Sequence, residues 1–191
     1  IEQPERRDAI ALFQDIIARD PGHVTALRAL RDLAVAEGRW ADALPAQERL
    51  MSAVAPDERT SEQTSLAGIH YERGRARMAE GDLTGGTAAF RDALRVRPDF
   101  VPAALALGDA HMQAGDPTQA LRVWERAVEA QPALPLLSRI EQQRREEGRP
   151  TRMIALYQAA AARQPDNLAL ALALGRVYFD LSMLDEAVEQ L

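Results

Sequence analysis

One pattern recurs along this chain of 191 residues at a step of 33 or 34 residues. Each copy has a small residue, then Gly seven residues later, then Ala, an aromatic residue, Ala and Pro. The clearest copy, 101–133, carries Leu107, Gly108, His111, Gly115, Ala120, Trp124, Ala127 and Pro132. A helix-turn-helix unit of this length can bury its apolar face only against copies of itself. The period therefore predicts a helical solenoid.

The Pro that ends each copy sets the register of the repeats. It is found at Pro21, Pro98, Pro132 and Pro165, and Ala55-Pro56 fill the same place in the remaining copy. We expect one continuous array over 1–191. Its parts are a second helix at 4–23, repeats at 24–57, 67–100, 101–133 and 134–167, an insertion at 58–66, and a partial repeat at 168–191. We expect both ends to fall inside a repeat, without the polar capping helix of a complete solenoid.

Glycines and aromatic residues recur at fixed places in the repeats, and each place has a packing role. The two helices of a unit are expected to approach most closely at Gly74, Gly108 and Gly175. The first helix is predicted to end at a left-handed glycine, namely Gly38, Gly81, Gly115 or Gly148. The second helices carry Trp40, Phe90, Trp124 and Tyr157. We interpret these aromatic residues as structural, filling space between layers.

The insertion at 58–66 is the least regular part of the array. It follows Pro56 and is acidic at its start, and Thr60 stands three residues before Gln63, a spacing typical of a helix N-terminus. We therefore predict one long first helix from about Ser61 to Glu80. We expect this helix to protrude past its neighbours or to bend the superhelix.

The composition excludes several classes of site. All 23 basic residues are Arg and there is no Lys, so a phosphate-binding loop with its Lys and a Schiff-base enzyme are excluded within this chain. Cys is absent, which excludes thiol nucleophiles, disulfides and thiolate metal sites. The net charge of −6 argues against nucleic acid as a partner. No apolar stretch is long enough to span a bilayer, so this fragment is not expected to insert into a membrane.

The residues that could carry chemistry follow the repeat. His23 lies in a predicted loop, and His70 and His111 lie at packing positions of first helices. No Gly-x-Ser-x-Gly or His-x-x-x-His pattern occurs. The Gly-rich segment 81–86 lies at an inter-helix turn without a preceding strand, so we interpret it as a turn. We predict a protein that is not an enzyme and has no catalytic residue, metal site or cofactor.

A basic run near the end of one first helix is interleaved with acids. Arg139, Arg144 and Arg145 alternate with Glu141 and Glu146. We interpret the run as a salt-bridged helix face and not as a nucleic-acid surface.

The unit pattern resembles the tetratricopeptide repeat (TPR) over essentially the whole chain, most clearly in the units that start at 101, 134 and 168. The resemblance implies an all-α, right-handed superhelical solenoid of helix-turn-helix repeats whose first helices line a concave groove. Groove positions carried over from the family are Arg28, Asp32, Tyr71, Arg75, Met78, Leu105, Asp109, Met112, Gln113, Ser138, Gln142, Arg145, Leu172, Arg176 and Phe179. Such a groove is suited to a protein or peptide client, through apolar pockets and pairing of Arg with carboxylates.

One use of this family is a clamp that holds the C-terminal carboxylate of a chaperone with Lys and Asn. The corresponding places here hold Arg28, Asp32, Glu72, Pro102 and Arg139 or their neighbours, with no Lys and no matching Asn. The chain is therefore not expected to capture a chaperone tail.

A narrower resemblance is to lipopolysaccharide assembly protein B. It rests on a regular unit, a long insertion, the segment Leu66-Ala67-Gly68-Ile69-His70-Tyr71-Glu72, a loop with Gly81-Asp82-Leu83, and regular units with Leu107-Gly108-Asp109. The resemblance implies a cytoplasmic bacterial array, tethered to the inner membrane by a segment absent from this chain. It implies control of the turnover of the deacetylase that commits carbon to lipid A, through a membrane protease.

We therefore expect a binding scaffold that recruits a client in its groove. The alternative is a structural component of an envelope or secretion complex that forms a homo-oligomer. We expect Ala at Tyr71, Arg75 and Arg176 to weaken capture without loss of helicity, and Gly108→Leu to unfold its unit.

Overall fold

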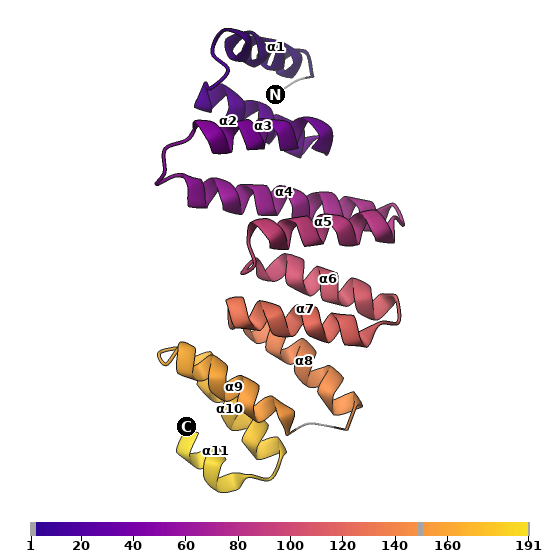
Figure 1. The fold of residues 1–191 in the computed structure, drawn as a ribbon, viewed down its shortest axis with the longest axis vertical. Helices are drawn as coiled ribbons and strands as arrows, with labels where there is room; N and C mark the ends of the chain where they lie inside the picture. The colour runs from indigo at the N-terminus through magenta and orange to yellow at the C-terminus, as the bar shows by residue number, and fades with distance from the viewer. Residues whose placement is uncertain (1–2, 149–150, 191) are drawn as a thin grey trace. The chain divides into compact units, whose positions relative to one another are not determined.

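The computed structural model describes residues 3–148 and 151–190, and every regular element within these ranges is an α-helix (Figure 1). The helices are α1 (Gln3–Arg19), α2 (Val24–Ala36), α3 (Trp40–Ala53), α4 (Arg59–Ala79), α5 (Leu83–Val96), α6 (Val101–Gln113), α7 (Pro117–Ala130), α8 (Leu134–Glu146), α9 (Arg152–Arg163), α10 (Leu168–Asp180) and α11 (Leu184–Gln190). The all-α solenoid class is confirmed. The chain divides into two compact units, 1–97 and 98–191. That both belong to one array stays a prediction.

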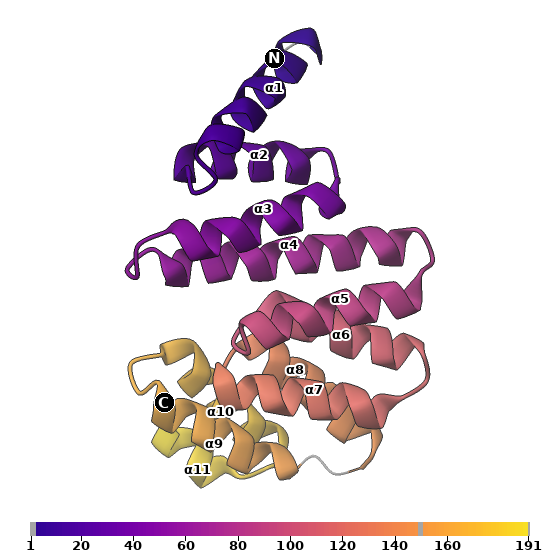
Figure 2. The same cartoon turned by 45° about the horizontal axis from the view of Figure 1, so that its top comes forward.

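The 1–97 unit consists of two antiparallel hairpins and the leading helix α1. Helices α2 and α3 form one hairpin, α4 and α5 form the other, and α3 packs against α4 (Figures 1 and 2). Helix α1 packs on α2, where Ile17 joins Leu27 and Leu50 in one apolar cluster. A second cluster joins the hairpins through Ala43 and Ile69.

The 98–191 unit contains three hairpins, formed by α6 with α7, α8 with α9, and α10 with α11. Their first helices are neighbours in order, because α6 contacts α8 and α8 contacts α10. The largest buried side chains on the second helices are Trp124 and Tyr157. Phe90 holds the same place in the other unit and is also buried, which agrees with a packing role for these aromatic residues.

The turns of the first four hairpins use the predicted left-handed glycine. Gly38, Gly81, Gly115 and Gly148 have φ between +67° and +82°. In the last hairpin Ser182 holds this position with φ +60°, a conformation that a residue with a side chain adopts only at a cost. After the turn, Asp82 and Asp116 cap their helices by accepting bonds from backbone N–H groups.

The close approach of helices predicted at Gly74 and Gly108 is confirmed. A Cβ atom on Gly74 would lie 2.5 Å from the Phe90 ring, and one on Gly108 would lie 2.0 Å from Nε1 of Trp124. Each glycine precedes its aromatic partner by 16 residues. Gly175, the third predicted position, is buried on α10.

Two hairpins use the same 16-residue spacing for a polar pair. Arg31 donates a hydrogen bond of 2.7 Å to Gln47, and the Tyr157 hydroxyl donates one of 2.9 Å to Glu141. The same two repeat positions, 16 residues apart, therefore hold either a glycine and an aromatic ring or a hydrogen-bonded polar pair.

The long helix predicted over the insertion is present as α4, with 21 residues. Its first residue is Arg59, two residues before the predicted start at about Ser61. Glu58, and not Thr60, is the N-cap residue, and the Thr60 carbonyl inside the helix accepts a bond from the Thr64 hydroxyl. The first turns of α4 do not simply protrude past their neighbours. Glu62 is 4% exposed and is bonded to α2 and α3.

Candidate functional site

The side chains carried over as groove residues all lie on the first helices of the hairpins. In the 1–97 unit, Arg28 and Asp32 are on α2, and Tyr71, Arg75 and Met78 are on α4. In the 98–191 unit, α6 carries Leu105, Asp109, Met112 and Gln113, α8 carries Ser138, Gln142 and Arg145, and α10 carries Leu172, Arg176 and Phe179. We call this second set the first-helix face of the 98–191 unit.

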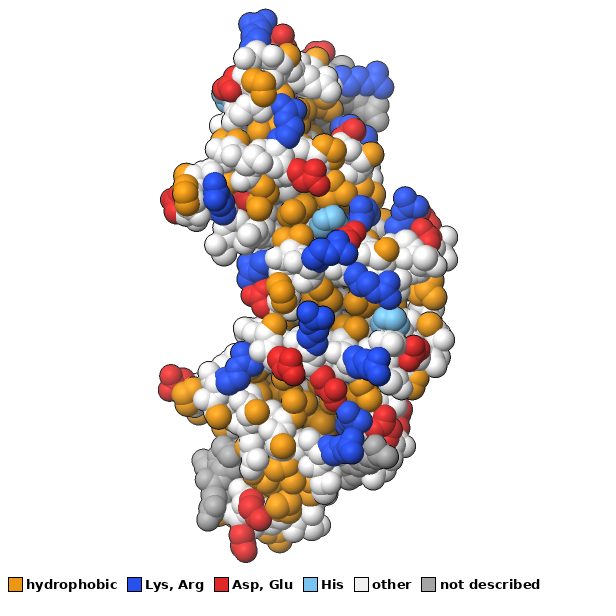
Figure 3. Space-filling view, in the orientation of Figure 1, with side chains coloured by type: hydrophobic (Ala, Val, Ile, Leu, Met, Phe, Trp, Pro, Cys, Tyr) orange, Lys and Arg blue, Asp and Glu red, His pale blue; other side chains and the backbone are white. Residues whose placement is uncertain are grey.

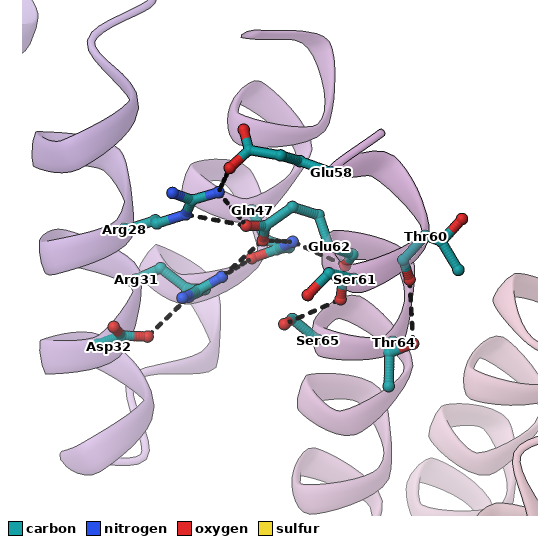
Figure 4. A network of polar contacts seen from close by, with 10 residues as sticks. All are labelled: Arg28, Arg31, Asp32, Gln47, Glu58, Thr60, Ser61, Glu62, Thr64 and Ser65. Atoms are coloured by element: carbon teal, nitrogen blue, oxygen red, sulfur yellow. Dashed lines mark hydrogen bonds and ion pairs between the residues drawn. The ribbon is translucent and has the colours of Figure 1, made fainter. Parts of the chain in front are cut away.

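Arg28 takes part in a polar network around the buried carboxylate of Glu62 (Figure 4). Arg28 donates to Glu62 at 2.9 Å and to Glu58 at 3.0 Å. Arg31 and Gln47 donate to the other Glu62 oxygen at 2.8 and 3.0 Å. The Gln47 amide also binds the Glu62 carbonyl, at 2.9 Å. Arg28 is thus a link between α2 and α4, and its charge is already matched.

The network keeps Glu62 ionised. Burial raises the pKa of its carboxyl, but the hydrogen bonds from Gln47 and Arg28 and the charge of Arg31 lower it by more, so this pKa lies below its usual range.

Two more predicted residues of the 1–97 unit, Arg75 and Tyr71, also have partners within the chain. Arg75 lies over the Tyr71 ring, 5.9 Å from its centroid, and pairs with Glu72 at 3.1 Å. Tyr71 in turn contacts the Phe90 ring at a centroid distance of 5.8 Å. Asp32 lines a hollow of about 220 Å³ between α2 and α4, where Gly68 leaves space.

A second network surrounds Glu141 in the 98–191 unit. Arg176 donates to both Glu141 oxygens, at 2.7 and 3.2 Å, and Arg145 donates to one of them at 2.9 Å. Both guanidinium groups also pair with Asp180, at 2.6 Å from Arg145 and 3.4 Å from Arg176. Tyr157 reaches the same carboxylate from α9. The network joins three helices around a side chain that is 8% exposed.

The charges in this second network stabilise one another. Burial raises the pKa of Glu141, but the bonds from Arg176 and Tyr157 and the charges of Arg176 and Arg145 lower it below its usual range. Removal of Arg176 would leave a buried carboxylate with fewer partners, which destabilises a fold. That Ala at Tyr71, Arg75 and Arg176 weakens capture without loss of helicity stays a prediction, but Arg176 also has a structural role, because it pairs with the buried Glu141.

Three predicted residues meet at a cavity of about 190 Å³ between α6 and α8. We call it the α6–α8 cavity, and its lining consists of Asp109, Met112, Trp124, Arg139, Gln142 and Gln143. Arg139 and Asp109 form two parallel bonds of 2.9 and 3.0 Å at its side. Trp124 and Gln143 are 2% and 8% exposed. The wall of this cavity thus contains apolar side chains, buried polar residues and the ion pair of Asp109 with Arg139.

Apolar side chains are exposed on α10. Leu172 is 58% and Phe179 is 66% exposed, and Arg176 lies between them on the same helix face. Leu168, Leu184 and Val188 are also exposed. Figure 3 shows apolar side chains at the surface over the C-terminal helices, with basic and acidic side chains intermixed elsewhere on that face. Exposed Leu and Phe on a formed helix are typical of a contact surface.

The salt-bridged face predicted around Arg144 is confirmed, with different partners. Arg144 pairs with Glu125 at 2.6 Å and Glu147 at 2.8 Å, and Arg139 pairs with Asp109. Among the residues that the structure describes, no group of three His, Asp or Glu side chains is arranged to hold a metal ion. No helix in the described ranges is long and apolar enough to cross a membrane.

The two polar pairs and the lining of the cavity were not predicted from the sequence. Counting 16 residues back from Gln47 and Tyr157 would have shown Arg31 and Glu141 at the position of the close-approach glycines. Trp124 was interpreted as structural, and nothing in the sequence showed that it also borders a cavity.

The repeated helical hairpins match a known protein family. A family model described as "Tetratricopeptide repeat" matches residues 2–58, 71–135 and 144–191. No curated protein matches the chain. These matched residues cover most of the sequence.

Several solved structures are similar in fold. "Crystal structure of MamA" is 16% identical, with 87% of this chain and 93% of that chain covered and a TM-score of 0.48. "YrrB: a TPR protein with an unusual peptide-binding site" is 17% identical, with coverage of 93% and 88% and a TM-score of 0.46. A thermophilic TPR protein of Thermus thermophilus is 20% identical, with coverage of 91% of each chain and a TM-score of 0.39. The chain belongs to the tetratricopeptide repeat family, whose members are generally non-catalytic scaffolds for protein–protein interaction.

Proposed function

We propose that the first-helix face of the 98–191 unit binds an extended or helical peptide segment of a client protein. The observation that carries this proposal is the α6–α8 cavity, which is lined by the predicted groove residues Asp109, Met112 and Gln142. A cavity on an otherwise packed helix pair supplies the concave, partly apolar site that anchors a side chain of a partner.

The pairing of the arginines changes how the client would be recognised. Arg145 and Arg176 already bind Glu141 and Asp180. A carboxylate on the client would have to compete with these partners, so charge supplies little net affinity. The exposed Leu172 and Phe179 offer apolar area instead. We therefore expect affinity to come from apolar anchors on α10 and from the cavity.

A selection of peptides from a random display library on the purified chain tests this proposal. We expect selected peptides to lose at least about tenfold in affinity for the double variant Leu172→Asp and Phe179→Asp, because two exposed apolar contacts are replaced by charges. Both residues are exposed, so helicity by circular dichroism is expected to stay unchanged.

The matched control carries new charge on a second helix of the same unit. Arg122 is exposed on α7, and Arg122→Glu is expected to leave peptide affinity within about twofold. Peptides that bind the α10 double variant as tightly as the parent chain, or a selection that yields no binder, would count against the first-helix face.

Self-association is a second candidate function, favoured by the further exposed apolar residues Leu184 and Val188 on α11. It predicts a concentration-dependent mass in light scattering that falls to that of a monomer on Leu184→Asp with Val188→Asp. A monomer in the unchanged chain at every concentration tested rules this candidate out.

A role in lipopolysaccharide regulation is a narrower form of the first proposal. It is motivated by the resemblance of the region around the long helix α4 to lipopolysaccharide assembly protein B. In this form the client is the lipid A deacetylase or the membrane protease that degrades it. Co-purification of the chain with either purified protein tests the narrower form, and failure with both would remove it while leaving peptide binding open.

A further inference from the structure

We infer that the α6–α8 cavity selects a carboxamide side chain, as a Gln or Asn residue of the bound peptide presents it. The inference rests on the proposed function, because it specifies which side chain the first-helix face would recognise. It is carried by residues that line this cavity: Trp124, whose indole N–H has no partner among the described residues, the buried Gln143, and the ion pair of Asp109 with Arg139.

The indole N–H of Trp124 is the first of these groups. Trp124 is 2% exposed, and within the described residues its Nε1 has no hydrogen-bond partner. It faces Gly108 on α6, the residue directly before Asp109. Because buried N–H groups are almost always bonded, this donor favours a ligand that brings an acceptor oxygen.

Gln143 supplies the second group. Its side chain is 8% exposed and borders the same cavity from α8. A carboxamide offers an N–H₂ donor and an oxygen acceptor on one planar group. A second carboxamide is its complement, because it can accept from one group and donate to another. The cavity thus favours a ligand with both functions.

The ion pair decides the charge of the ligand. Arg139 and Asp109 hold each other through two bonds and neutralise each other at the cavity wall. A ligand carboxylate would be repelled by Asp109 while it is attracted by Arg139, and a ligand ammonium would meet the reverse, so neither charge gains a net attraction that offsets its loss of hydration. A neutral polar group avoids both repulsions. An apolar group would leave the N–H without a partner.

Access to the indole needs a small rearrangement. Nε1 of Trp124 is covered by protein atoms, so the ligand oxygen must displace a neighbouring side chain to reach it. Among the lining residues, Met112 is unbranched with three rotatable bonds, so its side chain can move at low cost. The methylene groups of a Gln ligand would then contact the Met112 thioether.

Two-dimensional nitrogen NMR on the full chain tests the inference directly. The chain has two Trp residues, so its indole region should contain two signals, from Trp124 and from Trp40 in the other unit. The probes are N-acetyl-glutamine methylamide and its glutamate, lysine and norleucine analogues. We expect the glutamine probe to shift the Trp124 signal in a saturable way, to leave Trp40 unmoved, and to bind at least about tenfold more tightly than the norleucine probe.

Substitutions assign the effect to the cavity. Gln143→Leu should abolish the preference for glutamine over norleucine, and Gln131→Leu, the same change at an exposed residue after α7, should preserve it. Trp124→Phe removes the N–H, and Phe is native at the equivalent position 90. In that variant, binding is followed through the backbone amide signals of Asp109 and Met112, because the indole signal is lost. The preference for glutamine over norleucine should again be absent.

Equal binding of the glutamine and norleucine probes, or no shift of Trp124 with any probe, would overturn the inference. Tighter binding of the glutamate or lysine probe would overturn it as well. The proposed function stands or falls separately, because peptides selected on the chain can depend on Leu172 and Phe179 without showing any preference for Gln or Asn.

Discussion

At the residue scale, two buried carboxylates tie first helices to their neighbours. Glu62 binds donors from α2 and α3, and Glu141 binds donors from α8, α9 and α10. In each case the donors outnumber the single carboxylate, which explains why burial does not raise its pKa above the usual range. The groove arginines predicted for binding are therefore partly structural.

Loss of Arg176 should destabilise the 98–191 unit. Arg176→Ala removes two bonds to the buried Glu141, and because the guanidinium is half exposed we expect a loss of about 1–2 kcal/mol in the free energy of unfolding. Urea denaturation followed by circular dichroism measures it. Arg122→Ala on α7 is the control, expected within about 0.5 kcal/mol. Equal effects of the two changes would show that the network adds nothing.

The pH dependence of stability follows from Glu141. The pKa of Glu141 is lowered in the folded state, whereas the unfolded carboxyl has a pKa of about 4.3. The unfolded state therefore takes up protons first, so the stabilisation is complete above that pH and is lost as pH falls through the folded pKa. We expect Glu141→Gln to be less stable at pH 7 and to lose less stability on acidification. Urea midpoints between pH 3 and 7 check this, and parallel pH profiles would contradict it.

Ser182 holds a turn position that the other hairpins give to glycine. Because its φ is +60°, Ser182→Gly should stabilise the hairpin of α10 and α11 by about 0.5–1 kcal/mol. The reverse change, Gly115→Ala, should destabilise by a similar amount, since φ is +76° there. Thermal unfolding of both variants measures the difference. A Tm that falls on Ser182→Gly would refute the strain argument.

At the scale of the element, one pair of positions 16 residues apart determines how a hairpin closes. In α6 and α7 a glycine allows an aromatic ring to lie against the backbone, and in α8 and α9 a hydroxyl meets a carboxylate. A hairpin that combined one residue of the first pair with one residue of the second would contain either a steric clash or an unpaired polar group. The two residues of such a pair therefore have to change together for a hairpin to stay well packed.

A double-mutant cycle tests this pairing. Glu141→Gly leaves the Tyr157 hydroxyl without its acceptor, and Tyr157→Phe leaves Glu141 with one donor fewer. The double variant reproduces the native pair Gly74 and Phe90, so we expect its loss of stability to be smaller than the sum of the single losses by about 1–2 kcal/mol. Urea denaturation of the four proteins measures the coupling. Additive losses would mean that the positions act independently.

At the scale of the whole molecule, the repeat period was enough to predict the helices, their turns and the family. The turn glycines were predictable because they depend on local backbone geometry, and the close-approach glycines because they recur with the period. The long helix α4 was predictable from length and composition, although its first residue was not. Helix starts are uncertain by one or two residues in a sequence, and here the helix begins after Glu58, whose side chain binds Arg28 and does not cap the helix.

The site was predictable only in part, for a physical reason. A family position indicates which helix face a side chain occupies, and each predicted residue lies on the expected helix. A family position does not indicate which charged side chains pair between helices that are far apart in the sequence. Glu141 and Arg176 are 35 residues apart, and Arg28 and Glu62 are 34 apart. Such pairings, and the cavity left beside Trp124, depend on how the hairpins pack.

The central claim is that the first helices of the 98–191 unit, and not its second helices, hold the client. Hydrogen exchange with a selected peptide measures this directly, helix by helix, because the amides of contacted helices gain protection. We predict slower exchange in α6, α8 and α10 on peptide addition and little change in α7 and α9. Protection confined to α7 and α9, with α6, α8 and α10 unchanged, would contradict the account.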